Sequence, residues 1–320
     1  MSEANPLARA RLESAISGGL AFLRASQLPN GEWATLTSPH LDLRDGTAYP
    51  TSVYVTTFVL HTLATLAPGA RPADLIDRAV LFLRAEQDAT GLWNYEGRAG
   101  QRVYPDLDDT SCAVAALRLA GQQPDFAFFA HLWRCEAAVG GPYYTWVGLN
   151  DHPTAPNARE VDPLVNANIV YCCGCLGIEV PGATAYLRER IAAGDYAAKY
   201  CVSPHFLLYA ISRAYADGRV GGLETSMPAL QAYILRELPP PDAEPSAFNL
   251  ACLAASLLNS RAPGAIAAPY LAALVDRQAA DGSWPAWAAY LGFRGWYDGG
   301  PALTIAISLD ALAKALARDS

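Results

Sequence analysis

Hydrophobic residues recur with the helical period of 3.6 along almost the whole chain, and the alternation typical of strands is scarce. Some predicted helices, such as 72–87, carry charges on one face, as helices at a protein surface do. Others, such as 52–66 and 108–120, are apolar nearly all round and are expected to be buried. The pattern predicts about twelve helices, near residues 8–27, 52–66, 72–87, 108–120, 124–137, 164–177, 182–193, 204–217, 224–236, 245–259, 264–279 and 300–317.

The alternation of charged-face helices with fully apolar helices predicts the fold class. Outer and inner helices in six hairpins form an all-α (α/α)6 barrel, or toroid, and 320 residues suit a single domain that spans residues 1–320. Parallel inner helices place their N-termini at one end of the central cavity, with free backbone donors and partial positive charge. We therefore expect one polar mouth above an apolar, aromatic floor.

A short motif recurs at three predicted helix ends. It consists of a Gln, a Gly four residues later and a Trp two residues after that. The glycine ends the helix, and the tryptophan can fold back onto the helix end. We expect these residues to be structural and not to line the cavity. The three copies are Gln27-Gly31-Trp33, Gln87-Gly91-Trp93 and Gln278-Gly282-Trp284.

The strongest candidate for chemistry is a group of three aspartates, Asp106, Asp108 and Asp109, before an apolar helix. Carboxylates this close resist simultaneous ionisation, so in a dehydrated site one of them can stay protonated at neutral pH and act as an acid. Aspartates at this position are also good helix N-caps. The sequence leaves both roles open.

The repeats and the Asp-Leu-Asp-Asp segment together resemble the squalene-hopene cyclase and class II terpene cyclase superfamily. The similarity extends over essentially the whole chain, although the middle third lacks a clean copy of the repeat. The resemblance implies a cyclase of isomerase or lyase type, in which Asp108 protonates an alkene or epoxide of an isoprenoid substrate and Asp106 and Asp109 support it. That family usually places its active site between two barrels, whereas this chain has the length for one.

The proposed acid needs a partner and a suitable cavity. A helix N-terminus lowers the pKa of a carboxyl group, so a second group must hold the proton, and His205 is the candidate. Carbocations require aromatic faces around them. The residues expected to bind substrate at or near the mouth are Tyr54, Trp146, Asp162, Asn166, Tyr171, Tyr209, Arg294, Trp296 and Tyr297.

Composition narrows the partners. A net charge of −8 without a Lys/Arg cluster argues against nucleic acid, and no segment has the length and apolarity of a membrane span. Seven cysteines without a signal peptide predict reduced thiols in the cytoplasm. Protonation needs no cofactor or metal. Mg²⁺ is expected only if the substrate carries a diphosphate, and a homodimer or partner protein could close the cavity.

Three other functions remain open from the residues. A zinc-dependent prenyltransferase-like protein would use Asp109, Cys112 and His205 as ligands. A non-catalytic toroid could bind prenyl or polycyclic lipids, because a fold does not fix a function. A carbohydrate-active toroid would need two carboxyl groups, for which Asp108 and Asp162 are the candidates.

Overall fold

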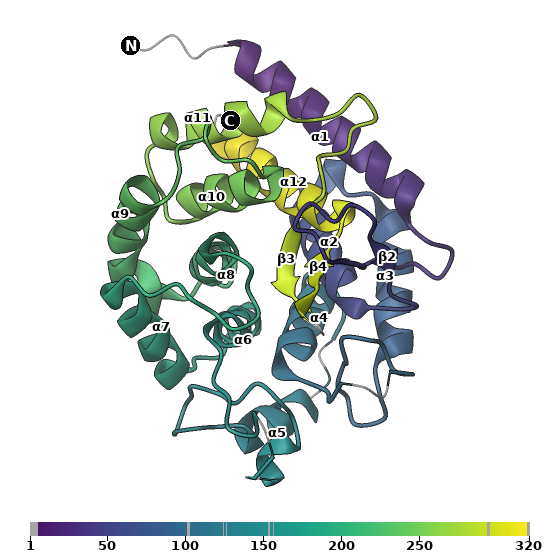
Figure 1. Cartoon of the computed structure of the whole chain (residues 1–320), viewed down its shortest axis with the longest axis vertical. Helices are drawn as coiled ribbons and strands as arrows, with labels where there is room; N and C mark the ends of the chain where they lie inside the picture. The colour runs from purple at the N-terminus through teal and green to yellow at the C-terminus, as the bar shows by residue number, and fades with distance from the viewer. Residues whose placement is uncertain are drawn as a thin grey trace.

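The computed structural model describes residues 6–100, 103–123, 125, 127–152, 154–155, 157–292 and 295–318. Six of its helices form an inner ring in which each helix packs against the next, and the last packs against the first (Figure 1). In chain order these are α2 (Val53–Thr65), α4 (Leu107–Leu119), α6 (Pro163–Cys175), α8 (Pro204–Ala216), α10 (Ala247–Asn259) and α12 (Pro301–Arg318). The ring is closed by the contact of α12 with α2.

Six further helices lie outside the ring (Figure 1). They are α1 (Pro6–Ser26), α3 (Ala73–Glu86), α5 (Ala127–Arg134), α7 (Pro181–Ala193), α9 (Met227–Glu237) and α11 (Gly264–Asp276). Three 3-10 turns lie in connections between an inner and an outer helix, at Pro68–Ala70, Leu149–Asp151 and Gly221–Ser226. The predicted α/α barrel is confirmed, and the predicted helix limits differ most at α5, which is shorter than expected.

Burial separates the two sets of helices as the hydrophobic pattern predicted. In α2 every residue from Val53 to Ala64 is buried. In α3 only Leu75, Ala79, Phe82 and Leu83 are buried, at the spacing of one helix face. A helix with apolar residues on every side is buried only if other elements pack against it on every side. Such helices therefore form the inner ring.

The inner helices run in the same direction. Tyr49 precedes α2 and Tyr95 precedes α4, and both hydroxyls donate hydrogen bonds to Asp298, which precedes α12. At the other end, Asp217 follows α8 and contacts His61 of α2 and Lys314 of α12. The helix starts therefore meet at one end of the barrel, as expected, and we call this end the mouth.

A small antiparallel sheet lies at the mouth, with strand order β2-β1-β4-β3. Its strands are β1 (Leu36–Ser38), β2 (Thr47–Ala48), β3 (Ala288–Leu291) and β4 (Tyr297–Gly299). Strands of two to four residues are too short for alternation to reveal them in a sequence. The sheet joins segments from the two ends of the chain, because β1 pairs with β4.

The three tryptophans of the repeated motif are buried and fold back onto their own helices, as predicted. Each indole N–H donates to the carbonyl ten residues earlier, at 2.8 Å for Trp33, 2.7 Å for Trp93 and 2.8 Å for Trp284. The glutamine amides donate to the glycine carbonyls of the same motif. In two copies the tryptophan backbone N–H also donates to a threonine hydroxyl of the next inner helix, Thr56 or Thr110. The motif thus fastens an outer helix end to an inner helix.

Among the described residues, no helix is both long and apolar enough to cross a membrane. All seven cysteines are unpaired thiols, five of them buried. Cys172 and Cys173 lie on α6 and are buried in the hydrophobic core.

Candidate active site

The sequence left open whether the aspartates at the start of α4 cap the helix or act as an acid. In the structure these two roles fall to different aspartates. Asp106 is the N-cap of α4, and its Oδ1 accepts a hydrogen bond from the backbone N–H of Asp109 at 2.7 Å. Asp108 makes no such cap and turns its carboxyl group toward α6 and β3. All three side chains are buried, with exposed fractions of 6%, 9% and 2% for Asp106, Asp108 and Asp109. Capping and acid chemistry are therefore compatible, because different residues serve them.

Burial raises the pKa of all three aspartates and so favours their protonated forms. Loss of water and the neighbouring Asp106 raise the pKa of Asp108 to about 8. Burial also raises the pKa of Asp106 to about 6 and that of Asp109 well above its ordinary value. The cap bonds of the helix oppose the rise at Asp106. At neutral pH Asp108 is thus mainly a neutral acid.

Asn168 of α6 and Arg213 of α8 orient that acid. The amide Nδ2 of Asn168 donates to Asp108 Oδ1 at 2.6 Å, and Nη2 of Arg213 donates to Asn168 Oδ1 at 2.6 Å. A guanidinium only donates, so Arg213 fixes which end of the amide faces Asp108. Oδ1 of Asp108 then accepts a hydrogen bond, which favours Oδ2 as the oxygen that carries the acid proton. The Tyr290 hydroxyl is 3.3 Å from Oδ2, a long hydrogen bond that a substrate can replace.

Arg213 is a buried cation inside the barrel, with 1% of its surface exposed. Its guanidinium carbon lies 4.1 Å from the ring centroid of Tyr171, 4.7 Å from that of Phe58 and 5.5 Å from that of Tyr209. Aromatic faces favour a cation at this range. Tyr171 and Tyr209 were expected to bind substrate, but they surround Arg213 below the cavity and do not line it.

A cavity of about 250 Å³ opens at the mouth above Asp108. Tyr54 and Tyr290 lie edge to face on its wall, with ring centroids 4.4 Å apart. Tyr54 and Trp146, two of the residues expected to bind substrate, line this cavity. Five aromatic residues and four carboxyl groups line the cavity: Tyr54, Tyr95, Trp146, Tyr200 and Tyr290, with Asp106, Asp108, Asp109 and Asp298. The acid therefore faces π surfaces.

Asp162 and Asn166 lie at the mouth end but have structural contacts. The two oxygens of Asp162 accept hydrogen bonds from three backbone N–H groups, two of them in the first turn of α6. Asn166 holds the backbone of Tyr143 from both sides, at 2.8 Å from its N–H and 3.0 Å from its carbonyl. The expected shared cavity of these residues with Asp108 and His205 is not formed, since only Asp108 lines it. Asp162 is likewise not placed as the second carboxyl group of a carbohydrate-active site.

His205 does not hold the proton of Asp108, and this expectation was wrong. Its Nδ1 lies 3.1 Å from the Ser203 hydroxyl and its Nε2 lies 3.3 Å from Glu244 Oε2. A position in the first turn of a helix fixes the level of a side chain along the barrel but not the direction in which it points. Asn168, further along α6, occupies the place expected for His205.

The remaining predicted residues contribute little to the described cavity. Trp296 is 41% exposed, and Tyr297 pairs with Ser38 in the sheet; neither lines the cavity. Arg294 lies outside the described residues. The β3–β4 hairpin still matters, because Tyr290, Gly292 and Asp298 line the cavity from this side.

Arg213, Asn168, Tyr95 and Asp298 belong to the site but were not among the residues expected to catalyse or to bind substrate. Arg213 had a signal, a single charge inside an otherwise apolar helix segment. Asn168 lies two residues after Asn166, so it was visible but not distinguished from it. Tyr95 and Asp298 precede inner helices, where polar residues were expected, yet only the folded chain shows that they meet.

Lys199 is the only lysine or arginine among the described residues that line the cavity. Lys199 lines the cavity, but its ammonium donates to Asn157 at 2.8 Å and forms an ion pair with Glu160. Arg44 pairs with Asp42. Arg102, like Arg294, lies outside the described residues.

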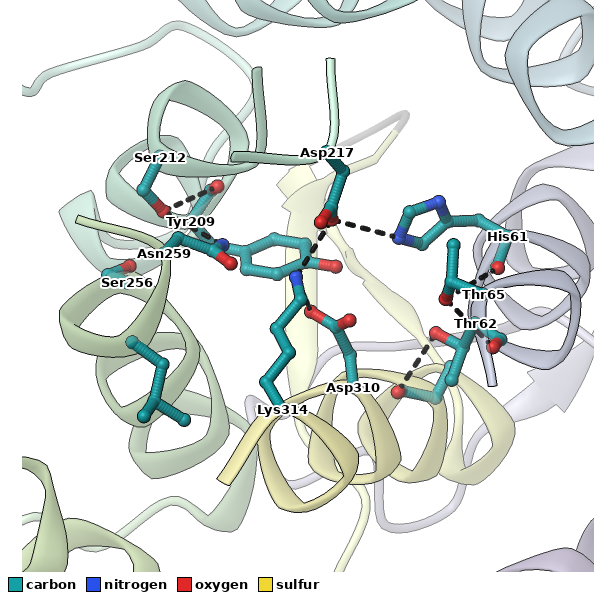
Figure 2. A network of polar contacts seen from close by, with 12 residues as sticks. His61, Thr62, Thr65, Tyr209, Ser212, Asp217, Ser256, Asn259, Asp310 and Lys314 are labelled. Atoms are coloured by element: carbon teal, nitrogen blue, oxygen red, sulfur yellow. Dashed lines mark hydrogen bonds and ion pairs between the residues drawn. The ribbon is translucent and has the colours of Figure 1, made fainter. Parts of the chain in front are cut away.

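One group of potential metal ligands occurs among the described residues, and it is not the expected one. Ligand atoms of His61, Asp217 and Asp310 lie within 4.8 Å of one another. The ammonium of Lys314 already lies between the two carboxylates, 2.8 Å from Asp217 and 2.9 Å from Asp310 (Figure 2). The zinc alternative needed Asp109, Cys112 and His205, which the structure does not bring together as such a group.

A larger groove of about 870 Å³ lies at the opposite end of the barrel. The C-terminal ends of α4, α6 and α8 surround it, and Asp217 is among its lining residues. It contains none of the aspartates at the start of α4. Chemistry, and not size, therefore identifies the smaller cavity as the candidate active site.

Solved structures share this fold. A variant of the type II terpene cyclase MstE from Scytonema, in complex with geranylgeranyl dihydroxybenzoate, is similar with a TM-score of 0.75 at 18% identity, over 97% of this chain and 99% of that chain. A protein from Actinoplanes is similar with a TM-score of 0.76 at 18% identity, over 95% and 99%. The ent-copalyl diphosphate synthase from Streptomyces platensis matches with a TM-score of 0.62 at 17% identity, over 82% of this chain and 50% of that chain.

No family model and no curated protein matches the sequence. The structural similarity nevertheless covers 99% and 98% of two MstE chains. The chain in these type II terpene cyclase structures is therefore also a single barrel of this size. The expected resemblance to class II terpene cyclases is confirmed at the level of the fold: this chain folds as a type II terpene cyclase barrel.

Proposed function

We propose that the protein is a class II-type terpene cyclase that protonates an alkene or epoxide of an isoprenoid and guides the cyclisation of the resulting carbocation. One observation carries the proposal: Asp108 is buried in the wall of an aromatic-lined cavity, where loss of water and the neighbouring Asp106 raise its pKa to about 8. A carboxylic acid that stays protonated at pH 7 needs this kind of dehydrated setting. The shared barrel fold is consistent with this chemistry.

The residues account for the steps of such a reaction. The proton moves from Asp108 Oδ2 to a terminal alkene carbon, whose π electrons form the new C–H bond and leave a carbocation, or to an epoxide oxygen, whose C–O bond then breaks. Asp108 becomes a carboxylate, which the amide N–H of Asn168 stabilises. The faces of Tyr54, Trp146 and Tyr290 surround the cation without offering a strong nucleophile. Loss of a proton from carbon completes an isomerisation.

The cavity favours a short prenyl chain with an uncharged reacting end. Its volume of about 250 Å³ is below the roughly 300–1,000 Å³ usual for sites of drug-sized ligands. Four carboxyl groups line it, and the described lysine on its wall is paired with Glu160. A diphosphate would be repelled at this point, so Mg²⁺ is proposed only for a substrate that carries one elsewhere.

Terpenoid and meroterpenoid substrates both fit this description. The MstE variant binds geranylgeranyl dihydroxybenzoate, so prenylated aromatic acids with shorter chains are natural first probes. The expected cytoplasmic location and closure of the cavity by a second copy or partner remain part of the proposal.

The test is turnover in D₂O. The purified protein is incubated with geranyl, farnesyl and geranylgeranyl dihydroxybenzoates, the free alcohols, their terminal epoxides and farnesyl diphosphate. The expected result is a cyclised product, and a product formed by alkene protonation carries one deuterium at the former terminal alkene. Tight binding of these probes with no conversion of any of them would contradict catalysis and favour the non-catalytic prenyl-lipid binder.

A further inference from the structure

The cavity contains a second buried carboxyl group that protonation does not use. Asp298 lies in β4, is 2% exposed and lines the same cavity as Asp108. Its strand pairs it with Tyr290, whose hydroxyl touches Asp108. The two carboxyl groups therefore approach one cavity from different sides, Asp108 from α4 and Asp298 from the β3–β4 hairpin.

The two hydroxyl hydrogen bonds to Asp298 converge on one of its oxygens. Oδ2 accepts from the Tyr49 hydroxyl at 2.9 Å and from the Tyr95 hydroxyl at 3.1 Å. Oδ1 is buried and has no hydrogen-bond partner within the described parts of the chain. A buried oxygen without a partner is costly, so its retention in the cavity wall needs an explanation. Two donors on one oxygen favour the charged form of the carboxyl group and fix its orientation.

Gly292 keeps space for this group. A Cβ built on Gly292 would lie 2.3 Å from Asp298 Oδ2 and 2.5 Å from Oδ1, so any side chain there must displace the carboxyl group. Gly292 also lines the cavity, next to Asp298. The backbone of Gly292 therefore lies directly against the carboxyl group of Asp298, and position 292 has no side chain that would cover this group.

We propose that Asp298 is the terminating base of the cyclisation proposed above. Its Oδ1 takes a proton from the carbon next to the final cationic centre, and the electron pair of that C–H bond becomes the new C=C bond. Asp108 has supplied one proton and Asp298 has removed one, so the reaction is balanced as an isomerisation. Asp298 then loses its proton to water at the mouth, and Asp108 regains one.

The surroundings of the two carboxyl groups agree with these opposite roles. Burial raises the pKa of Asp298, but the hydroxyls of Thr37, Tyr49 and Tyr95 act against that rise. Asp108 instead feels the repulsion of Asp106 in addition to burial, which brings its pKa to about 8. Asp108 thus has a like-charged neighbour, whereas Asp298 has hydrogen-bond donors, and such contrasting environments are typical of an acid and base pair.

The test compares Asp298→Asn with Asp77→Asn, an exposed control on α3. With a probe that the wild type cyclises, Asp298→Asn is expected to consume substrate but to shift the product at least about tenfold from the wild-type alkene to an alcohol or a different alkene isomer. Asp77→Asn keeps the wild-type product. Gly292→Ala, which displaces the carboxylate, is expected to shift products in the same direction.

Two results would overturn the proposal: the wild-type alkene in unchanged proportion from Asp298→Asn, or complete loss of substrate consumption by folded Asp298→Asn. If the wild type converts no probe, it is the cyclase function that fails, and the charge of Asp298 is tested separately. Carboxyl ¹³C NMR, assigned with Asp108→Asn and Asp298→Asn, should then show Asp298 ionised and Asp108 neutral at pH 7. Two neutral carboxyl groups would contradict the base.

Discussion

The two ends of the barrel both hold buried aspartates, but among the described residues only the aspartates at the end opposite the mouth form an ion pair with a lysine. At the mouth, Asp106, Asp108 and Asp109 lie together, and burial raises the pKa of each. At the opposite end, Lys314 donates to both Asp217 and Asp310 (Figure 2). At the mouth the aspartates are therefore favoured in their protonated form. At the opposite end Asp217 is an anion paired with Lys314.

Asp217 shows how the paired end works. Burial alone would raise its pKa, but the ammonium of Lys314 outweighs that effect, and the pKa is lowered. Asp310 lies deeper and keeps a raised pKa, because burial exceeds the effect of Lys314. Burial also lowers the pKa of His61 to about 3, with Arg213 adding to it, so this histidine is neutral. Burial and a neighbouring cation thus act on the pKa in opposite directions, and the same lysine prevails at Asp217 but not at Asp310.

Replacement of the aspartate at each end should separate chemistry from stability. Asp108→Asn keeps the shape and removes the acid, so turnover should fall by about 10²–10⁴-fold, the usual contribution of a general acid, or further. Asp217→Asn should keep the wild-type rate in its folded fraction. Steady-state rates of both variants check this, and retained turnover in Asp108→Asn would sink the cyclase proposal.

The lysine at each end gives the second contrast. Lys314→Met leaves two buried carboxyl groups without their cation and should lower the free energy of unfolding by about 3–5 kcal/mol. Lys199→Met removes a cation that is 48% exposed at the mouth, where a surface pair contributes about 0–1 kcal/mol. Urea unfolding measures both. Equal losses would show that the two ends do not differ as described.

The buried tryptophans near the mouth should affect stability and not chemistry. Trp93→Ala removes a buried indole and its hydrogen bond to Leu83, so we expect a loss of about 3–5 kcal/mol. Trp133 is 66% exposed, and Trp133→Ala is the matched control, with an effect within about 0.5 kcal/mol. Folded Trp93→Ala should keep its product. A changed product would show that the Gln-Gly-Trp motif contributes to the active site and does not only stabilise the fold.

The pH dependence gives the smallest and most specific effect. Asp108 must be protonated, so kcat/KM should fall about tenfold per pH unit above a pH of about 8. The hydrogen bond from Asn168 favours the charged form, so Asn168→Leu should move this limb to higher pH. Movement to lower pH would contradict the assigned direction of that hydrogen bond. A pH–rate profile of both proteins measures the shift.

Stability should respond to pH in opposite ways at the two ends. The pKa of Asp108 is raised in the folded protein, so its contribution is complete in acid and is lost as pH rises toward about 8. The pKa of Asp217 is lowered, so its contribution is present at neutral pH and is lost as pH falls. Melting temperatures of Asp108→Asn and Asp217→Asn across pH should each lose one of these dependences.

The sequence was sufficient for the barrel because its signals are local. An apolar surface all round α2 or α4, and a Gln, Gly and Trp at fixed spacing, depend on neighbours along one helix. The acid itself was also visible, since Asp106, Asp108 and Asp109 are adjacent in the chain. What holds and complements the acid was not, because Asn168, Arg213 and Asp298 come from three other elements.

The failure with His205 has the same origin. Equivalent starts of parallel helices predict a common level, and that level is correct for Asp162 and Asp108, which influence each other electrostatically. Direction around the helix axis depends on how each inner helix is rotated in the ring. His205 points to Glu244, and no pattern in one sequence specifies that rotation.

The closure of the ring by α12 on α2 has a consequence for how the protein is made. Asp108 is synthesised early, but Tyr290, Asp298 and the helix that completes the ring follow only near the end of the described chain. Until then the inner helices expose faces that are apolar all round, and contacts so distant in sequence form slowly. A growing chain thus has no partial active site, and a polypeptide that stops before α12 should aggregate instead of working at reduced efficiency.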